Sequence, residues 1–207
     1  MWPILLSFTL ALAAGAASAA SAARAAAPTP AVQSPAAVAS DTSSGRYANE
    51  EALSRYLAAR LLEQGGKLTE ALGEYYRALS LDPRSVDLLV RISQLCAHLG
   101  DPGRSLEFAE RALGRDPDDW RALWLQGAAR FSTGRVRDAL EPLERACELD
   151  STQAEVLRTT ARVAETLKRM DVAERAWRRL VYVDEDDGEA WFQIAATEAR
   201  RGNFRDA

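Results

Sequence analysis

The stretch ALGEYYRALSLDPRS, residues 71–85, has the apolar spacing of an amphipathic helix that ends at Asp82-Pro83. Thirty-four residues later the chain reads SLEFAERALGRDPDD, and after another 34 it reads ALEPLERACELDSTQ. Proline lacks a backbone N–H and disfavours helical geometry in the residue before it, so each Asp-Pro pair marks a helix end. A helix ending that returns at a fixed interval indicates a repeated structural unit.

The interval can be followed position by position when units begin at residues 52, 86, 120, 154 and 188. The eighth, twentieth and twenty-seventh positions hold small residues in all but one of fourteen cases, the exception being Leu180. Small side chains let two helices approach closely where they cross. The fifteenth position is glycine at residues 66, 100, 134 and 202, where a turn between helices needs a permissive backbone. Each unit is therefore predicted to be a helix–turn–helix pair.

This pattern resembles that of the tetratricopeptide repeat family. The family's repeat unit contains, in order, a large apolar residue, Leu-Gly, an aromatic residue, Ala-x-x-x-Phe and Pro. The residues that carry the resemblance are Leu123, Gly127, Ala71 with Tyr75, Ala173 with Trp177, Pro83 and Pro117. The resemblance covers residues 47–207 and implies an all-α fold. That fold is an α-solenoid of antiparallel helix pairs, about four and a half repeats forming a right-handed superhelix. The alternative is an ordinary helical bundle whose periodicity is accidental.

Five residues depart from the family pattern. Ser151 and Glu185 replace the terminal proline in units three and four. Arg130 and Glu198 stand where the family has an aromatic residue or leucine, and Pro142 lies inside a predicted second helix. Proline in a helix interior removes a hydrogen bond, so we expect a local bend there. These departures affect the expected packing and leave the architecture unchanged.

The first 22 residues differ in composition from the rest of the chain. An apolar stretch, Ile4–Leu12, precedes small residues at the spacing that a signal peptidase accepts, which predicts a signal peptide. An uncleaved N-terminal membrane anchor is the alternative. Residues 23–46, rich in Ala, Pro and Ser, have few large side chains and are predicted to be a disordered linker. We therefore expect an exported protein, periplasmic or secreted, or one anchored to a membrane through its N-terminus.

The sequence contains few residues of the types and spacings that catalysis needs. Its only histidine, His98, lies two residues from Cys96, so on a helix the two side chains point in different directions and form no dyad. Cys96 takes an inward-facing position and is predicted to be a structural thiol, and pairing with Cys147 is not expected. The acidic clusters at 116–119 and 184–187 are predicted to be turns and helix N-caps. We therefore expect no catalytic residues, no cofactor and no metal site, and not an enzyme.

The resemblance also implies where a partner would bind. In the family the first helices line a concave groove, with ligand-facing residues near positions two, five, nine and twelve or thirteen. Position five also contains Val90, and His98 lies near the same groove. The candidate partner-binding residues are Tyr56, Arg60, Gln94, Arg121, Trp124, Arg158, Arg162 and Phe192. Aromatic rings supply rigid apolar area and arginine offers a fork of donors, so these residues suit a peptide. Their chance occurrence at these positions is the alternative.

We therefore expect an exported scaffold that binds a protein or peptide partner in its groove. The net charge of −4 gives no reason to expect nucleic acid. The sequence reaches residue 207 inside the second helix of unit five, which predicts that it is part of a longer protein. One alternative is the docking region of a longer enzyme or cell-envelope assembly factor whose working domain lies beyond residue 207. Another is a self-assembling array, and the sequence leaves the oligomeric state open.

Overall fold

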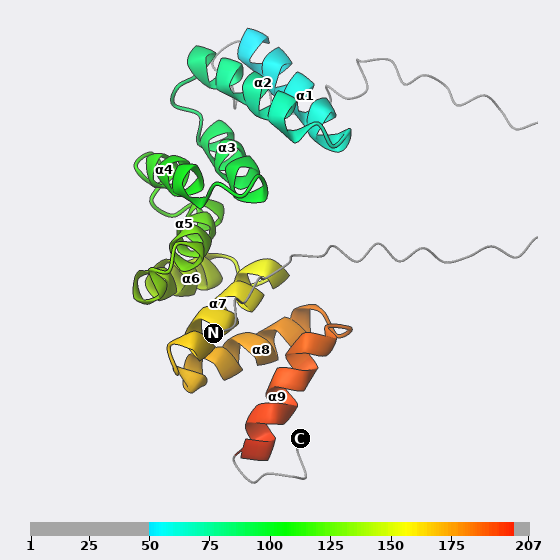
Figure 1. The fold of residues 1–207 in the computed structure, drawn as a ribbon, viewed down its shortest axis with the longest axis vertical. Helices are drawn as coiled ribbons and strands as arrows, with labels where there is room; N and C mark the ends of the chain where they lie inside the picture. Colours follow the sequence, from blue (N-terminus) through cyan, green and yellow to red (C-terminus); the bar gives the residue numbers. More distant parts are fainter. Residues whose placement is uncertain (1–49, 201–207) are drawn as a thin grey trace, which may run out of the picture. The chain divides into compact units, whose positions relative to one another are not determined.

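The structure, a computed structural model, describes residues 50–200, which contain nine α-helices and no β-strand (Figure 1). The helices are α1 (Glu50–Gln64), α2 (Leu68–Leu81), α3 (Val86–His98), α4 (Pro102–Leu113), α5 (Trp120–Ser132), α6 (Val136–Leu149), α7 (Ala154–Thr166), α8 (Met170–Val183) and α9 (Gly188–Arg200). The predicted signal peptide or anchor, the predicted linker and the last residues of unit five lie outside the described residues.

The helices follow one another as pairs joined by short turns. The two helices of each of the first four units pack most extensively against each other, and α9 is the first helix of the fifth unit. From the second unit onward, the first helices begin at residues 86, 120, 154 and 188, where the sequence places the unit starts. First helices of neighbouring units also touch, α3 with α5 and α5 with α7. These contacts confirm the predicted all-α solenoid of helix pairs.

In each complete unit, the turn between the two helices contains a residue with a left-handed backbone conformation. Gly66, Gly100 and Gly134 have φ angles of 74°, 78° and 80°, which glycine adopts without a steric cost. The fourth unit has Lys168 at the same position, with a φ of 60°. The next residue closes the turn in every case; Arg169, for example, donates its N–H to the carbonyl of Ala164 at 2.8 Å. The turn geometry is therefore retained even where the glycine is not.

The small residues at positions eight and twenty lie where the two helices of a unit cross. In the third unit, a Cβ atom on Gly127 would lie 2.5 Å from Cγ of Leu143 and 3.0 Å from the carbonyl oxygen of Ala139. In the second unit, Ser93 donates its hydroxyl hydrogen to the carbonyl of Ser105 at 2.7 Å. Both serines are fully buried. The crossing therefore leaves room for a hydrogen atom, a methyl group or a hydroxyl group, and for little else.

Aromatic residues at position twenty-four fill the space beside the crossing in two units. Tyr75 donates its hydroxyl hydrogen to Glu63 at 2.8 Å, and Trp177 donates its indole N–H to Glu165 at 2.9 Å. Both glutamates occupy position twelve of their unit. Burial, with the hydrogen bond to Glu63, raises the pKa of Tyr75 above its ordinary value. A buried aromatic group with a polar atom needs a partner, and the same unit supplies it from its first helix.

Three departures from the family pattern, at Arg130, Pro142 and Glu198, are compensated by contacts between helices. Helix α6 is continuous through Pro142, and because proline lacks an N–H, the carbonyl of Asp138 loses its usual helical donor. Arg130 donates to that carbonyl at 3.0 Å and also pairs with Glu110 at 3.5 Å. Glu198, buried in α9, accepts a hydrogen bond from Arg178 of α8 at 2.7 Å. Arg130 and Glu198 therefore replace apolar packing by hydrogen bonds and ion pairs between helices.

We predict that Gly127→Ala destabilises the protein by about 1–3 kcal/mol, because the new methyl group overlaps Leu143 and the Ala139 carbonyl. The higher helix propensity of alanine returns only about 1 kcal/mol of this cost. Gly73→Ala in α2 is the matched control, since a Cβ there meets no atom within 4 Å. Urea denaturation should show a lower midpoint for the first variant and an equal or higher one for the second. A midpoint for Gly127→Ala at or above that of the parent protein would contradict the crossing geometry.

Candidate interaction surface

The predicted site residues on α1 and α3 contact their own units. Tyr56 is half-buried, with its ring centroid 5.7 Å from that of Tyr75 on α2. Arg60 pairs with Glu63 of the same helix at 3.7 Å. Gln94 accepts a hydrogen bond from Arg91 at 3.2 Å. The polar contacts of Arg60 and Gln94 thus lie within a single helix.

Position five does not have the same exposure in every unit. Val90 in the second unit is 1% exposed and belongs to the core, whereas Phe192 in the fifth unit is 67% exposed. His98, in the last turn of α3, is exposed. The expectation that Val90 lines the groove is therefore wrong, because α3 packs that position into the interior of the repeat array.

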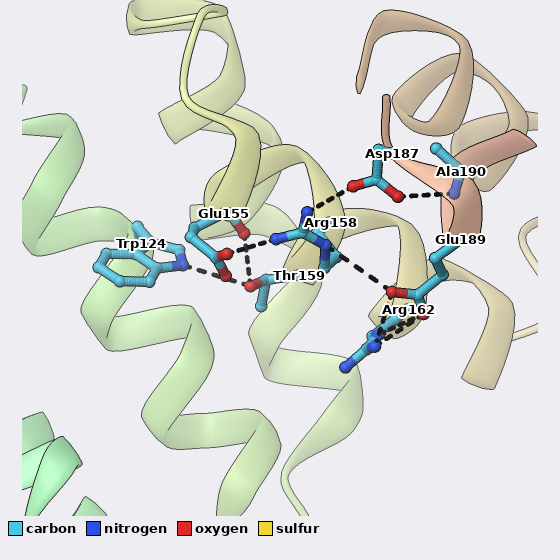
Figure 2. A network of polar contacts seen from close by, with 8 residues as sticks. All are labelled: Trp124, Glu155, Arg158, Thr159, Arg162, Asp187, Glu189 and Ala190. Carbon is cyan, nitrogen blue, oxygen red and sulfur yellow. Dashed lines mark hydrogen bonds and ion pairs between the residues drawn. The ribbon is translucent and has the colours of Figure 1, made fainter. Parts of the chain in front are cut away.

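Three first helices meet in one polar network around Arg158 of α7 (Figure 2). Its guanidinium donates to Glu155 on its own helix and to Asp187 at the start of α9, and it lies 3.7 Å from Glu189. Arg162, one turn further along α7, donates to the same Glu189 at 2.7 Å and 3.1 Å. The structure thus brings two predicted site residues together through a shared carboxylate.

The network reaches α5 through Trp124, whose indole N–H donates to the Thr159 hydroxyl at 3.3 Å (Figure 2). Thr159 in turn donates to the carbonyl of Glu155 at 2.7 Å. At the other end, Phe192 lies three residues after Glu189, on the same face of α9. We call Trp124, Arg158, Arg162, Glu189 and Phe192 the first-helix surface.

Arg121, predicted as a site residue, is held in a separate network. It donates to Asp119 at 2.5 Å and to Asp87 of the preceding unit at 2.9 Å. The hydrogen bond that Arg121 donates to Asp119 is the main reason that the pKa of Arg121 lies above its ordinary value. The guanidinium of Arg121 is therefore permanently charged and joins α3 to α5.

Asp187 joins Arg158 of the network to the start of α9. Its side chain is buried and accepts the backbone N–H of Ala190 at 2.9 Å, as predicted for an N-cap. Burial by itself disfavours a charged carboxylate, but the hydrogen bonds from Ala190 and Arg158 outweigh it and hold the pKa of Asp187 below its ordinary value. Asp119 caps α5 in the same way, accepting from Ala122 at 3.0 Å.

Sequence reasoning identified the arginines of this surface but not the carboxylates that pair with them. Asp87, Glu155 and Glu189 all occupy position two of their units, and Asp187 is the last residue of unit four. The charge pattern was a usable signal, because position two carries an acid in three units and an arginine in the third unit. The predicted arginines therefore lie in a surface of matched charges.

The metal-ligating side chains and the two cysteines can be located within the described residues. In residues 50–200, no group of three or more His, Cys, Asp or Glu side chains is placed to hold a metal ion. Cys96 and Cys147 are both free thiols, and burial raises the pKa of each. Both thiols therefore stay protonated at neutral pH, which agrees with a structural role for Cys96.

None of the helices within the described part of the chain combines the length and the apolar character that crossing a membrane requires.

The helix pairs, the left-handed turns and the small crossing residues define an α-solenoid repeat protein. Residues 92–154 match the family model for the tetratricopeptide repeat. Residues 92–154 therefore form a tetratricopeptide repeat region within the chain.

Several solved structures have a similar fold. MamA of Desulfovibrio magneticus RS-1 is 16% identical, with a TM-score of 0.66 over 76% of this chain and 89% of that one. YrrB, described as a TPR protein with an unusual peptide-binding site, is 20% identical, with a TM-score of 0.62 over 73% and 78%. The first TPR of Spaghetti, solved with the HSP90 peptide SRMEEVD, is 20% identical, with a TM-score of 0.56 over 59% and 98%. Similarity at this level establishes the fold.

We predict that Asp187→Asn destabilises the protein by about 1.5–3 kcal/mol at pH 7, because Arg158 loses a buried charged partner. The folded protein holds the pKa of Asp187 below the unfolded value of about 3.9, so the carboxylate stabilises the fold above that pH. Its contribution disappears as the pH falls through the folded-state pKa. Urea midpoints of parent and variant should therefore differ at pH 7 and converge as the pH falls below the folded-state pKa.

The matched control is Asp186→Asn in the same turn, since Asp186 is exposed. It should have little effect at either pH. A difference between parent and Asp187→Asn that persists unchanged at low pH would show that the charge of Asp187 is not what stabilises α9.

Proposed function

We propose that this protein is an exported scaffold that binds a peptide or protein partner across its first-helix surface. The observation that carries the proposal is the order of groups across α5, α7 and α9. A half-buried Trp124 is followed by the Arg158–Arg162–Glu189 network and then by the exposed ring of Phe192. Aromatic side chains and arginine are the residue types enriched at binding interfaces.

The polar network supports this proposal because it is already ordered without a ligand. Arg158 is held by three carboxylates, so its guanidinium lies in one place. Arg162 and Glu189 remain in contact with solvent, with side chains 47% and 36% exposed. A ligand can therefore contact one donor and one acceptor group whose positions are set, and loses less entropy than it would on a flexible surface.

The matched charges also favour one class of ligand over another. A purely acidic peptide would have to displace Glu189 from Arg162, and a purely basic one would have to displace Arg162 from Glu189. A peptide backbone offers N–H and C=O groups side by side, so it can bond to both groups and leave the ion pair in place. We therefore infer an extended segment of modest net charge, with an apolar side chain over Phe192.

The solved relatives support binding of a peptide as the function of this class. YrrB is described as having a peptide-binding site, and the Spaghetti repeat was solved with a bound peptide. The export part of the proposal rests on the first 22 residues, whose apolar stretch and small residues are typical of a signal peptide.

The binding prediction uses a peptide selected from a displayed random library against the mature chain. Phe192→Ala should weaken binding of that peptide about 30-fold or more, the loss expected at a hot spot. The melting temperature should change little, because Phe192 is largely exposed. Tyr182→Ala is the matched control, since this aromatic side chain is 87% exposed and lies on α8, the second helix of unit four. If Tyr182→Ala weakens binding and Phe192→Ala does not, the partner docks on the second helices and the proposed surface is wrong.

N-terminal sequencing of the protein expressed with its full N-terminus should find a start near Ala20 or Ala23, since small residues precede both positions at the signal peptidase spacing. The cleaved protein should be found outside the cytosol. An intact Met1 on protein in the cytosolic fraction would rule out export by a cleaved signal peptide.

A further inference from the structure

A hollow of about 190 Å³ opens between the second helices α6 and α8. Leu157 and Thr160 of α7 form part of its lining and are both buried. Val172 and Ala176 of α8 and Cys147 of α6 add further apolar surface. The hollow lies on the second-helix side and includes no residue of the first-helix surface.

The hollow exists because the positions that face this gap hold different residues from those at the equivalent gap between α2 and α4. Between α2 and α4, the gap is closed by Tyr76 and Phe108, whose ring centroids lie 5.6 Å apart. These residues occupy position twenty-five of one unit and position twenty-three of the next. Between α6 and α8, the same two positions hold Glu144 and Ala176. The α6–α8 gap therefore lacks the pair of aromatic rings that fills its counterpart.

The two walls of the hollow carry opposite charges. Glu144 and Glu148, one turn apart on α6, line one wall, and Arg175 and Arg179, one turn apart on α8, line the other. Arg175 pairs with Asp171 of its own helix at 3.7 Å. Among the described residues, no ion pair at 4 Å or less joins these glutamates to these arginines across the hollow.

We propose that this hollow is a second binding site, which takes one aromatic side chain of a peptide that also carries one basic and one acidic residue beside it. The aromatic ring would fill the α6–α8 gap as the rings of Tyr76 and Phe108 fill the α2–α4 gap. The basic residue would contact Glu144 and Glu148, and the acidic residue would contact Arg175 and Arg179. This proposal goes beyond the proposed function and does not depend on the first-helix surface.

The size and chemistry of the hollow favour an aromatic side chain over a larger ligand. Pockets for drug-sized ligands typically enclose about 300–1,000 Å³, so this one suits a single side chain. Its apolar lining gains from burial of a ring, and the Cys147 sulfur offers a favourable contact with an aromatic edge. Cys147 donates or accepts a hydrogen bond with Thr160 at 3.2 Å, so its sulfur has a defined position in the lining.

The test uses two blocked tripeptides, acetyl-Lys-Phe-Glu-amide and acetyl-Lys-Ala-Glu-amide, titrated into the mature protein. Binding is followed by NMR shifts of the methyl groups of Leu157 and Val172. The rate at which iodoacetamide alkylates Cys147, measured by mass spectrometry, is the second readout. With the phenylalanine peptide we expect saturable NMR shifts and slower alkylation of Cys147. The alanine peptide should bind at least about tenfold more weakly. Equal affinity for the two peptides, or no shifts with either, would overturn the proposal.

Two variants distinguish the site from a merely structural gap. Glu144→Tyr combined with Ala176→Phe should fill the hollow, as Tyr76 and Phe108 fill theirs, and should abolish binding while Cys147 becomes protected without any peptide. Arg179→Glu, at an exposed position, should fold normally and lose binding because both walls become acidic. Retention of binding by Arg179→Glu, or by the filled variant where it folds, would show that the peptide binds elsewhere.

Discussion

The structure depends on the close approach of two helices at positions eight and twenty of each unit. In the third unit a hydrogen atom on Gly127 faces Leu143 and the Ala139 carbonyl, and in the second unit Ser93 bonds directly to Ser105. Backbones this close fix the angle of the pair and require a tight turn, which a left-handed residue provides. Tyr75 and Trp177 then fill the space beside the crossing in their units.

Neighbouring units are joined by different forces on their two sides. On the first-helix side, ion pairs cross from unit to unit, from Arg121 to Asp87 and from Arg162 to Glu189. On the second-helix side, side chains either fill the gap, as Tyr76 and Phe108 do, or leave a hollow. A buried charge needs a partner of opposite charge, so the residue types on the first-helix side are restricted. A gap between second helices can be filled by any apolar side chain of suitable volume, so the residue types there can vary.

Equivalent positions therefore have different roles in different units. Position five is core at Val90, a network arginine at Arg158 and an exposed ring at Phe192. The repeat sets the place of each side chain, and the neighbouring units set its exposure and its partner. A binding surface in such a chain is defined by three adjacent first helices, since Trp124, Arg158 and Phe192 come from three units.

The sequence by itself determined the architecture, because the crossing and the turn are local requirements that recur every 34 residues. The unit starts, the buried small residues and the N-caps at Asp119 and Asp187 could all be read from spacing and residue type. The sequence could not show that Val90 is buried, that Glu189 is shared by two arginines, or that Arg130 bonds to the carbonyl that Pro142 frees. Each of these depends on the distance between side chains of different helices, which only the packing of one helix against the next decides.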